Sequence, residues 1–84
     1  MRAVITQAAQ VAEILRGRRR ARRIPQQELA NKLGISQSRL SAIESGSSAL
    51  TLERLVALAN LLDLQLVVQE RSRKAGKPTD DADW

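Results

Sequence analysis

The sequence contains no cysteine and no histidine, and only one of its 84 residues is aromatic. Without cysteine it can form no disulfide, which favours a reducing, cytoplasmic location. Without cysteine and histidine, the commonest metal ligands and nucleophile–base pairs cannot be assembled. The remaining acids, among them Glu44, Glu53, Asp63 and Glu70, lie in separate elements with no convergent spacing. We therefore expect no enzymatic activity, no metal and no cofactor.

Long hydrophobic runs are also missing. No stretch approaches the roughly 20 apolar residues that a membrane-spanning helix needs, so we expect no membrane partner. The length allows one small domain. Because aromatic side chains are almost absent, the core must consist of Leu, Ile, Val and Ala, which suits packed helices. A core this small is marginal by itself, so we expect a homodimer.

Basic residues outnumber acidic ones, with 14 Lys and Arg against 9 Asp and Glu and a net charge of +5. Such an excess favours a polyanionic partner such as nucleic acid. Arginines gather at the end of a first expected helix, which is capped at Thr6 and runs to about Arg20. Cations suit the negative end of a helix dipole, and they can also neutralise phosphates. From this cluster we expect phosphate contacts by Arg18, Arg19 and Arg22.

The stretch 26–46 predicts two short helices joined by a tight turn. In the first helix, Leu29, Ala30 and Leu33 fall at helical spacing and form one apolar face. Gly34 follows, and glycine readily adopts the positive φ angle that the end of a helix often requires. The spacing therefore predicts that the chain turns at this glycine.

The second helix of the pair is expected to begin after Ser36, a capping residue, and to end at Gly46. Leu40 and Ile43 face inward. The outward face is polar and nearly uncharged, and it carries Gln37, Ser38, Ser41 and Ser45. Amide and hydroxyl groups can donate and accept hydrogen bonds at base edges in a major groove. The alternative is a helical hairpin in an all-α core whose serines are merely exposed.

This stretch resembles the lambda-repressor-like (Xre/Cro) helix-turn-helix family. The matching pattern is Gln26-x-x-Leu29-Ala30, Leu33-Gly34-Ile35, Ser36-Gln37, Leu40-Ser41, Ile43-Glu44 and Gly46. The resemblance implies an all-α fold of four or five helices that binds a double-stranded DNA operator. Gln26 is then expected to contact a phosphate and to brace Gln37.

On that basis the base readers are expected to be Gln37, Ser38 and Ser41. Glutamine makes a bidentate match to adenine in the major groove. Further phosphate contacts are expected from Ser36, Arg39 and Ser47. For the serines, helix capping and loop hydrogen bonds are the alternative.

Beyond the helix pair, Thr51 can cap another helix, whose expected buried side includes Leu52 and Val56. Residues 64–71 then alternate apolar and polar side chains and include valines, which predicts a β-strand. One strand has no mate in a helical domain, so we expect it to pair with the same strand of a second subunit. A continuing helix is the alternative, because Leu and Gln also form helices.

The composition changes after this strand. We expect a DNA-binding and dimerisation domain over residues 1–72 and a flexible tail over 73–84, which is rich in Gly, Pro and acids. Trp84, the only aromatic residue, ends this tail. It could be a surface residue without a role, but tryptophan is strongly enriched among the buried anchors of protein interfaces.

Taken together, the arginine-rich first helix, the Gln/Ser helix, the strand and the tail resemble the HipB antitoxins of HipA–HipB toxin–antitoxin systems. The resemblance implies a dimer that represses its own operon in the bacterial cytoplasm, at the nucleoid. It also implies a HipA-type serine/threonine kinase-like toxin as partner, with Trp84 inserted into it. The alternative is a stand-alone Xre-family repressor whose tail has no role. A protein-only inhibitor is disfavoured by the Gln/Ser face and the arginines.

Overall fold

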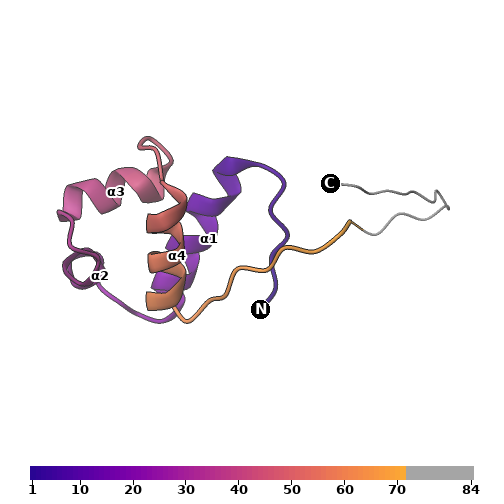
Figure 1. Ribbon diagram of the computed structural model, residues 1–84. Helices are drawn as coiled ribbons and strands as arrows, with labels where there is room; N and C mark the ends of the chain where they lie inside the picture. Colours follow the sequence, from indigo (N-terminus) through magenta and orange to yellow (C-terminus); the bar gives the residue numbers. More distant parts are fainter. Residues whose placement is uncertain (72–84) are drawn as a thin grey trace, which may run out of the picture.

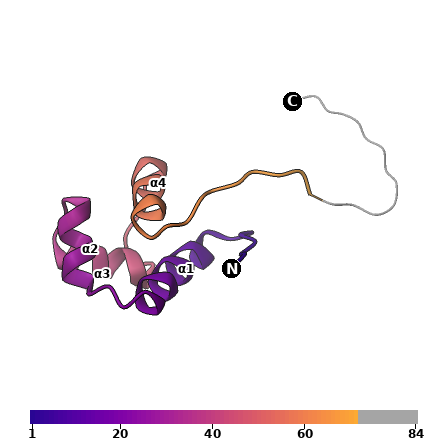
Figure 2. The same ribbon diagram turned by 90° about the horizontal axis from the view of Figure 1, so that it is seen from below.

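In the computed structural model, which describes residues 1–71, the chain forms four α-helices and no β-strand within that range (Figure 1). The helices are α1 (Ala8–Ala21), α2 (Gln26–Leu33), α3 (Gln37–Ser45) and α4 (Leu52–Leu61). Every helix in this part of the chain is too short or too polar to span a membrane. Helices α2 and α3 lie at one end of the helical body, while the N-terminal segment and residues 64–71 leave it at the other end (Figures 1 and 2).

The predicted caps and stops set the bounds of α2, α3 and α4. Helices α2 and α3 each end at a glycine in the left-handed region, Gly34 with φ 79° and Gly46 with φ 82°. The Oγ of Ser36 accepts the backbone N–H of Arg39 at 3.0 Å and so caps α3. Thr51 caps α4 in the same way. The two helices and the tight turn between them are thus confirmed.

The start of α1 differs from the expectation. Gln7, not Thr6, occupies the capping position. The Oε1 atom of Gln10 accepts the backbone N–H groups of Thr6 at 2.7 Å and of Gln7 at 2.9 Å. A glutamine inside the first turn thereby satisfies backbone donors that lack a partner at the start of a helix, as in a capping box.

Apolar side chains from all four helices form one buried cluster. Its largest fully buried members are Leu29, Leu40, Ile43, Leu58 and Leu62. The inward orientation predicted for Leu40 and Ile43 is confirmed. Leu52 and Val56, in contrast, were expected on the buried side of α4 but are 72% and 42% exposed. Helix α4 therefore also presents apolar surface away from the core.

Residues 64–71 leave the helices as a single segment and do not form the expected strand (Figure 1). At its start, the backbone N–H of Leu64 donates to the carbonyl of Ala59 at 2.8 Å. The large apolar side chains beyond that point are exposed: Leu66 by 45%, Val67 by 66% and Val68 by 98%. A strand requires a ladder of backbone hydrogen bonds from a neighbour, and no other segment among residues 1–71 supplies one. The strand therefore remains a prediction about an assembly of two chains.

Candidate nucleic-acid interface

The first turns of α3 present short polar side chains to solvent. Gln37, Ser38 and Ser41 are all exposed. On the other side of the same helix, Leu40 and Ile43 are only 0% and 2% exposed and pack in the core. The expected base readers therefore share one outward face on a helix that is fixed from behind. Their amide and hydroxyl groups can both donate and accept hydrogen bonds, which is what base edges in a major groove require.

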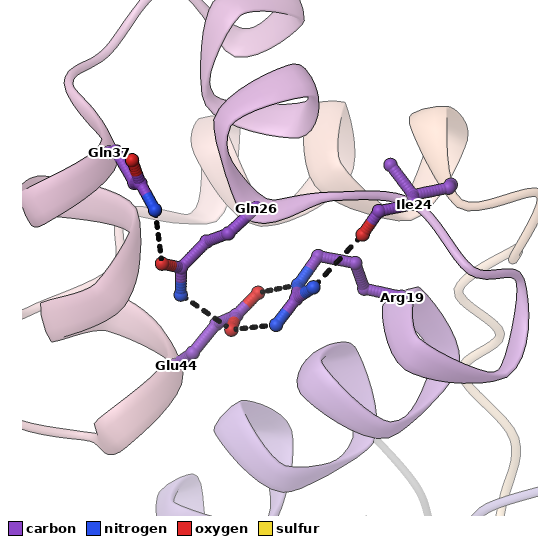
Figure 3. A network of polar contacts seen from close by, with 5 residues as sticks. All are labelled: Arg19, Ile24, Gln26, Gln37 and Glu44. Carbon is purple, nitrogen blue, oxygen red and sulfur yellow. Dashed lines mark hydrogen bonds and ion pairs between the residues drawn. The ribbon is translucent and has the colours of Figure 1, made fainter.

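Gln37 is held from the side by α2. Its Nε2 donates to the Oε1 of Gln26 at 3.2 Å, so the brace expected from the family resemblance is present (Figure 3). The Nε2 of Gln26 in turn donates to the Oε1 of Glu44 at 3.1 Å. Gln37, the expected base reader on α3, is thus connected to a carboxylate inside the protein.

That carboxylate belongs to a buried ion pair between α1 and α3. The Nε and Nη2 atoms of Arg19 donate to the two oxygens of Glu44 at 2.7 Å and 2.9 Å, and its Nη1 donates to the carbonyl of Ile24 at 2.9 Å. The side chains of Arg19 and Glu44 are only 10% and 4% exposed. This geometry corrects the phosphate contact predicted for Arg19, because all three nitrogens of its guanidinium already bond inside the protein.

Sequence reasoning missed this pair, although α1 carried a signal for it. Val11, Leu15 and Arg19 follow one another at intervals of four and lie on one side of the helix. Arg19 thus continues the stripe of side chains that packs against α3. A charged residue on such a stripe must find a partner, because an unpaired buried charge is strongly unfavourable.

Arg18 turns to a different part of the molecule. Its Nε donates to the carbonyl of Leu62 at 3.0 Å, and its Nη2 lies 4.0 Å from the carboxylate of Asp63. The guanidinium therefore serves the C-terminal end of α4, where backbone carbonyls lack helical partners. This position disfavours the predicted phosphate contact of Arg18. Arg22 and Arg39 are exposed, so both side chains are accessible for the phosphate contacts predicted for them.

The two serines predicted to contact phosphates differ in their surroundings. The hydroxyl of Ser36 accepts the backbone N–H of Arg39, which leaves its hydrogen available for a phosphate. The Oγ of Ser47 donates to the carbonyl of Ala42 at 3.3 Å and lies 3.0 Å from the Oγ of Ser45. The hydroxyl of Ser47 is therefore engaged in hydrogen bonds within the loop, which is the alternative considered for the serines.

Removing the charges of Arg22 and Arg39 is expected to flatten the salt dependence of DNA binding. Each phosphate contact releases counterions, so the slope of log K against log salt should fall by about one unit per lost contact. Fluorescence anisotropy of an operator duplex titrated with Arg22→Gln/Arg39→Gln over a range of salt concentrations measures this slope.

Arg18→Gln is the control for a single lost charge, because it removes one positive charge from a side chain that faces α4. Its slope should stay close to that of the unmodified protein. A drop half as large as that of the double variant would show that only net charge matters. A slope unaffected by the double substitution would exclude the two phosphate contacts.

The predicted tail and the toxin contact predicted for Trp84 lie outside the described residues, as does the last residue of the predicted domain.

Comparison with known proteins agrees with this geometry. A family model described as "Helix-turn-helix" (HTH_3) matches residues 14–68, well over half of the 84 residues, and includes all of α2, α3 and α4. No curated protein matches the chain. Members of the matched family are sequence-specific DNA-binding regulators and typically not enzymes. The chain therefore belongs to the Xre/lambda-repressor-like helix-turn-helix family.

Proposed function

We propose that the chain is a sequence-specific operator-binding antitoxin, which represses its own operon and binds a HipA-type kinase-like toxin. One observation carries the DNA-binding part: Gln37, Ser38 and Ser41 form an exposed polar row on a helix that Leu40 and Ile43 anchor in the core. In helix-turn-helix proteins the N-terminal residues of the second helix contact base edges in the major groove. The proposed phosphate contacts around this row are Gln26, Ser36, Arg22 and Arg39.

We further propose that a homodimer binds the operator and that residues 64–71 join its subunits. An open groove lies between residues 1–6 and residues 63–69, with side chains of α1 and α4 at its base. Exposed apolar side chains border it on both sides, namely Val4, Ile5, Leu66, Val67 and Val68. Extended apolar surface is uncommon on monomeric proteins. The same segment of a second copy can cover it and supply the missing backbone partners.

The position of this segment is compatible with DNA binding. Residues 64–71 leave the helical body at the end away from α2 and α3 (Figure 2). Pairing there leaves the α3 helix of each subunit uncovered. A two-fold pair of such helices reads half-sites about 34 Å, or one DNA turn, apart. The assembly acts at its operator in the bacterial cytoplasm.

The antitoxin part is supported by the resemblance of the strand and tail to HipB proteins. A terminal tryptophan on a tail fits the chemistry of an interface anchor, because it buries a large side chain in a partner's pocket. A stand-alone Xre-family repressor is the second candidate, and the helix-turn-helix match favours it equally. The two differ in whether Trp84 has a partner. A neighbouring open reading frame for a kinase-like protein favours the antitoxin.

Gln37→Ala is expected to reduce the preference for one base pair in each half-site by roughly 5- to 150-fold, the value of a bidentate base contact. Competition binding against operators that carry each of the four base pairs at every position measures the preference. Gln27→Ala is the control, since Gln27 is an exposed glutamine of α2 that bonds to Asn31 at 2.9 Å. If the base preference of Gln37→Ala matches that of the control, the reader assignment is wrong.

Deleting residues 73–84 is expected to weaken binding of the neighbouring kinase-like toxin by about 30-fold or more, the loss typical of an interface hot spot. Operator affinity and dimerisation should not change, because neither is assigned to the tail. Calorimetric titration of the toxin with full-length, truncated and Trp84→Ala proteins measures the loss. Equal toxin affinity for all three proteins rules out the tail contact and leaves the stand-alone repressor.

A further inference from the structure

Four side chains form a chain of hydrogen bonds from the core to the proposed reading surface (Figure 3). It runs from Arg19 through Glu44 and Gln26 to Gln37, with successive contacts of 2.7, 3.1 and 3.2 Å. The first two members, Arg19 and Glu44, are buried, whereas Gln26 is half-buried and Gln37 is exposed. A buried charge is thereby connected to the side chain proposed to read a base.

Arg19 and Glu44 decide which group donates and which accepts at each step of this chain. An ionised carboxylate can only accept hydrogen bonds, and a guanidinium can only donate them. Glu44 must therefore face the amino group of Gln26, not its carbonyl. The carbonyl of Gln26 then points to Gln37, which must turn its own amino group inward.

We propose that Glu44 is a specificity-determining positioning residue, which fixes the amide orientation of Gln37 through Gln26. The inference rests on the proposed DNA-binding function. In this orientation Gln37 keeps its carbonyl oxygen and one N–H hydrogen for the DNA. That pair matches the N6 amino group and the N7 acceptor of adenine. The reverse orientation turns the amino group of Gln37 outward, which suits the two acceptors of guanine.

The burial of Glu44 strongly favours one orientation of the Gln26 amide. Reversing Gln26 would set its carbonyl oxygen against the carboxylate of Glu44, whose side chain is only 4% exposed and has little access to water. An acceptor left facing another acceptor in a buried place disfavours the reversed state by about 5- to 150-fold. Two glutamines in contact only with water and each other lack this bias, because both directions then satisfy the same number of hydrogen bonds.

Gln26→Met tests the connection while it leaves the ion pair intact. The variant removes the hydrogen bonds to Glu44 and Gln37 and keeps a side chain of similar length. Preference for adenine over guanine at the base pair read by Gln37 should fall by about 5-fold or more. A lost phosphate contact, in contrast, lowers affinity for all sequences alike. Gln27→Met, next to it on α2, should leave the preference unchanged.

Glu44→Gln tests the direction. Arg19 donates to both oxygens of Glu44, and Gln26 donates to one of the same two oxygens. An amide offers one acceptor and one amino group in their place, so Gln26 is no longer held in a single orientation. The preference for adenine over guanine should therefore fall. Because this variant weakens a buried ion pair, thermal unfolding is measured alongside DNA binding.

Arg19→Met/Glu44→Leu keeps the test decisive if Glu44→Gln does not fold. It removes both charges and fills their space with apolar groups, which proteins usually tolerate. The folded double variant should lose the preference for adenine by the same factor as Gln26→Met. Competition binding to the operator series described for Gln37→Ala gives the preference of each variant.

The outcomes separate the inference from the function beneath it. If the unmodified protein prefers no sequence, the proposed function fails and the inference with it. If Gln37→Ala loses the preference for adenine while Gln26→Met and Arg19→Met/Glu44→Leu keep it, the function stands and the inference is wrong. A shared loss in all three variants, without loss in Gln27→Met, supports the positioning role.

Discussion

Glu44→Ala should lower the free energy of unfolding by about 3–5 kcal/mol, because it leaves the buried guanidinium of Arg19 without its carboxylate. The pair is only 10% and 4% exposed, so water cannot replace the missing partner. A hydrophobic core in a domain of this size rarely supplies more than about 3–5 kcal/mol. The variant should therefore be largely unfolded as a monomer. Urea and thermal unfolding followed by circular dichroism measure the loss.

Glu28→Ala is the matched control for this experiment. It also removes one carboxylate from an ion pair, but Glu28 and Lys32 are exposed and 3.5 Å apart on the surface of α2. Such a pair contributes about 0.3–0.5 kcal/mol. If Glu44→Ala were no more destabilising than Glu28→Ala, the pair between α1 and α3 would not be structural.

Replacing both members of the pair should destabilise the protein less than Glu44→Ala does. Arg19→Met/Glu44→Leu leaves no buried charge without a partner, so most of the stability should return. The difference between the double variant and the sum of the single variants gives the coupling energy of the pair. If the double variant is as stable as the unmodified protein but has lost the preference for adenine, the charges of this pair are needed for base recognition and not for folding.

Much of the helical framework was predictable, because its signals are local. Gly34 and Gly46 end their helices by adopting positive φ, and a side chain at either position would strain the backbone. Ser36 and Thr51 act through hydrogen bonds to residues only three positions away. The outward face of α3 was predictable for a similar reason, since the inward direction of Leu40 and Ile43 fixes the opposite face.

The ion pair was harder to predict, because its members are far apart in the sequence. Arg19 and Glu44 are separated by 25 positions and meet only when α1 packs against α3. Arg19 stands among other arginines, so charge alone does not distinguish it from Arg18 or Arg22. Helical phase separates the first two, because it directs Arg19 to the core and Arg18 to the end of α4. Arg22 follows the last residue of α1 and is exposed.

The predicted strand depends on a partner that one chain does not provide. Its alternating pattern resembles that of a half-buried strand, but the apolar side chains of residues 66–68 are exposed in the single chain. Leu52 and Val56 of α4 are likewise apolar side chains that are exposed in the single chain. Sequence patterns report which side chains need burial, and they do not say whether the covering surface belongs to the same molecule.

Leu66→Asp/Val68→Asp is expected to convert the proposed dimer to a monomer. The two side chains lie on one side of an alternating segment, and a charge at each would be buried against the second copy. Gln65→Asp/Gln69→Asp is the matched control, because it adds the same number of acids to the other side. Sedimentation equilibrium at micromolar concentration should show a monomer for the first variant and a dimer for the second.

The same variants should separate dimerisation from base recognition. Two linked half-site contacts bind more tightly than one by about 100-fold or more, so the monomer should lose that factor on a full operator. On a duplex with a single half-site, the monomeric variant should bind with the same affinity as one subunit of the unmodified protein. The reason is that residues 64–71 lie away from α3 (Figure 2). Equal loss on both duplexes would mean that the substitutions damaged α3, the proposed reading helix. A monomeric unmodified protein would exclude the paired strands, and the apolar groove would then need a different partner.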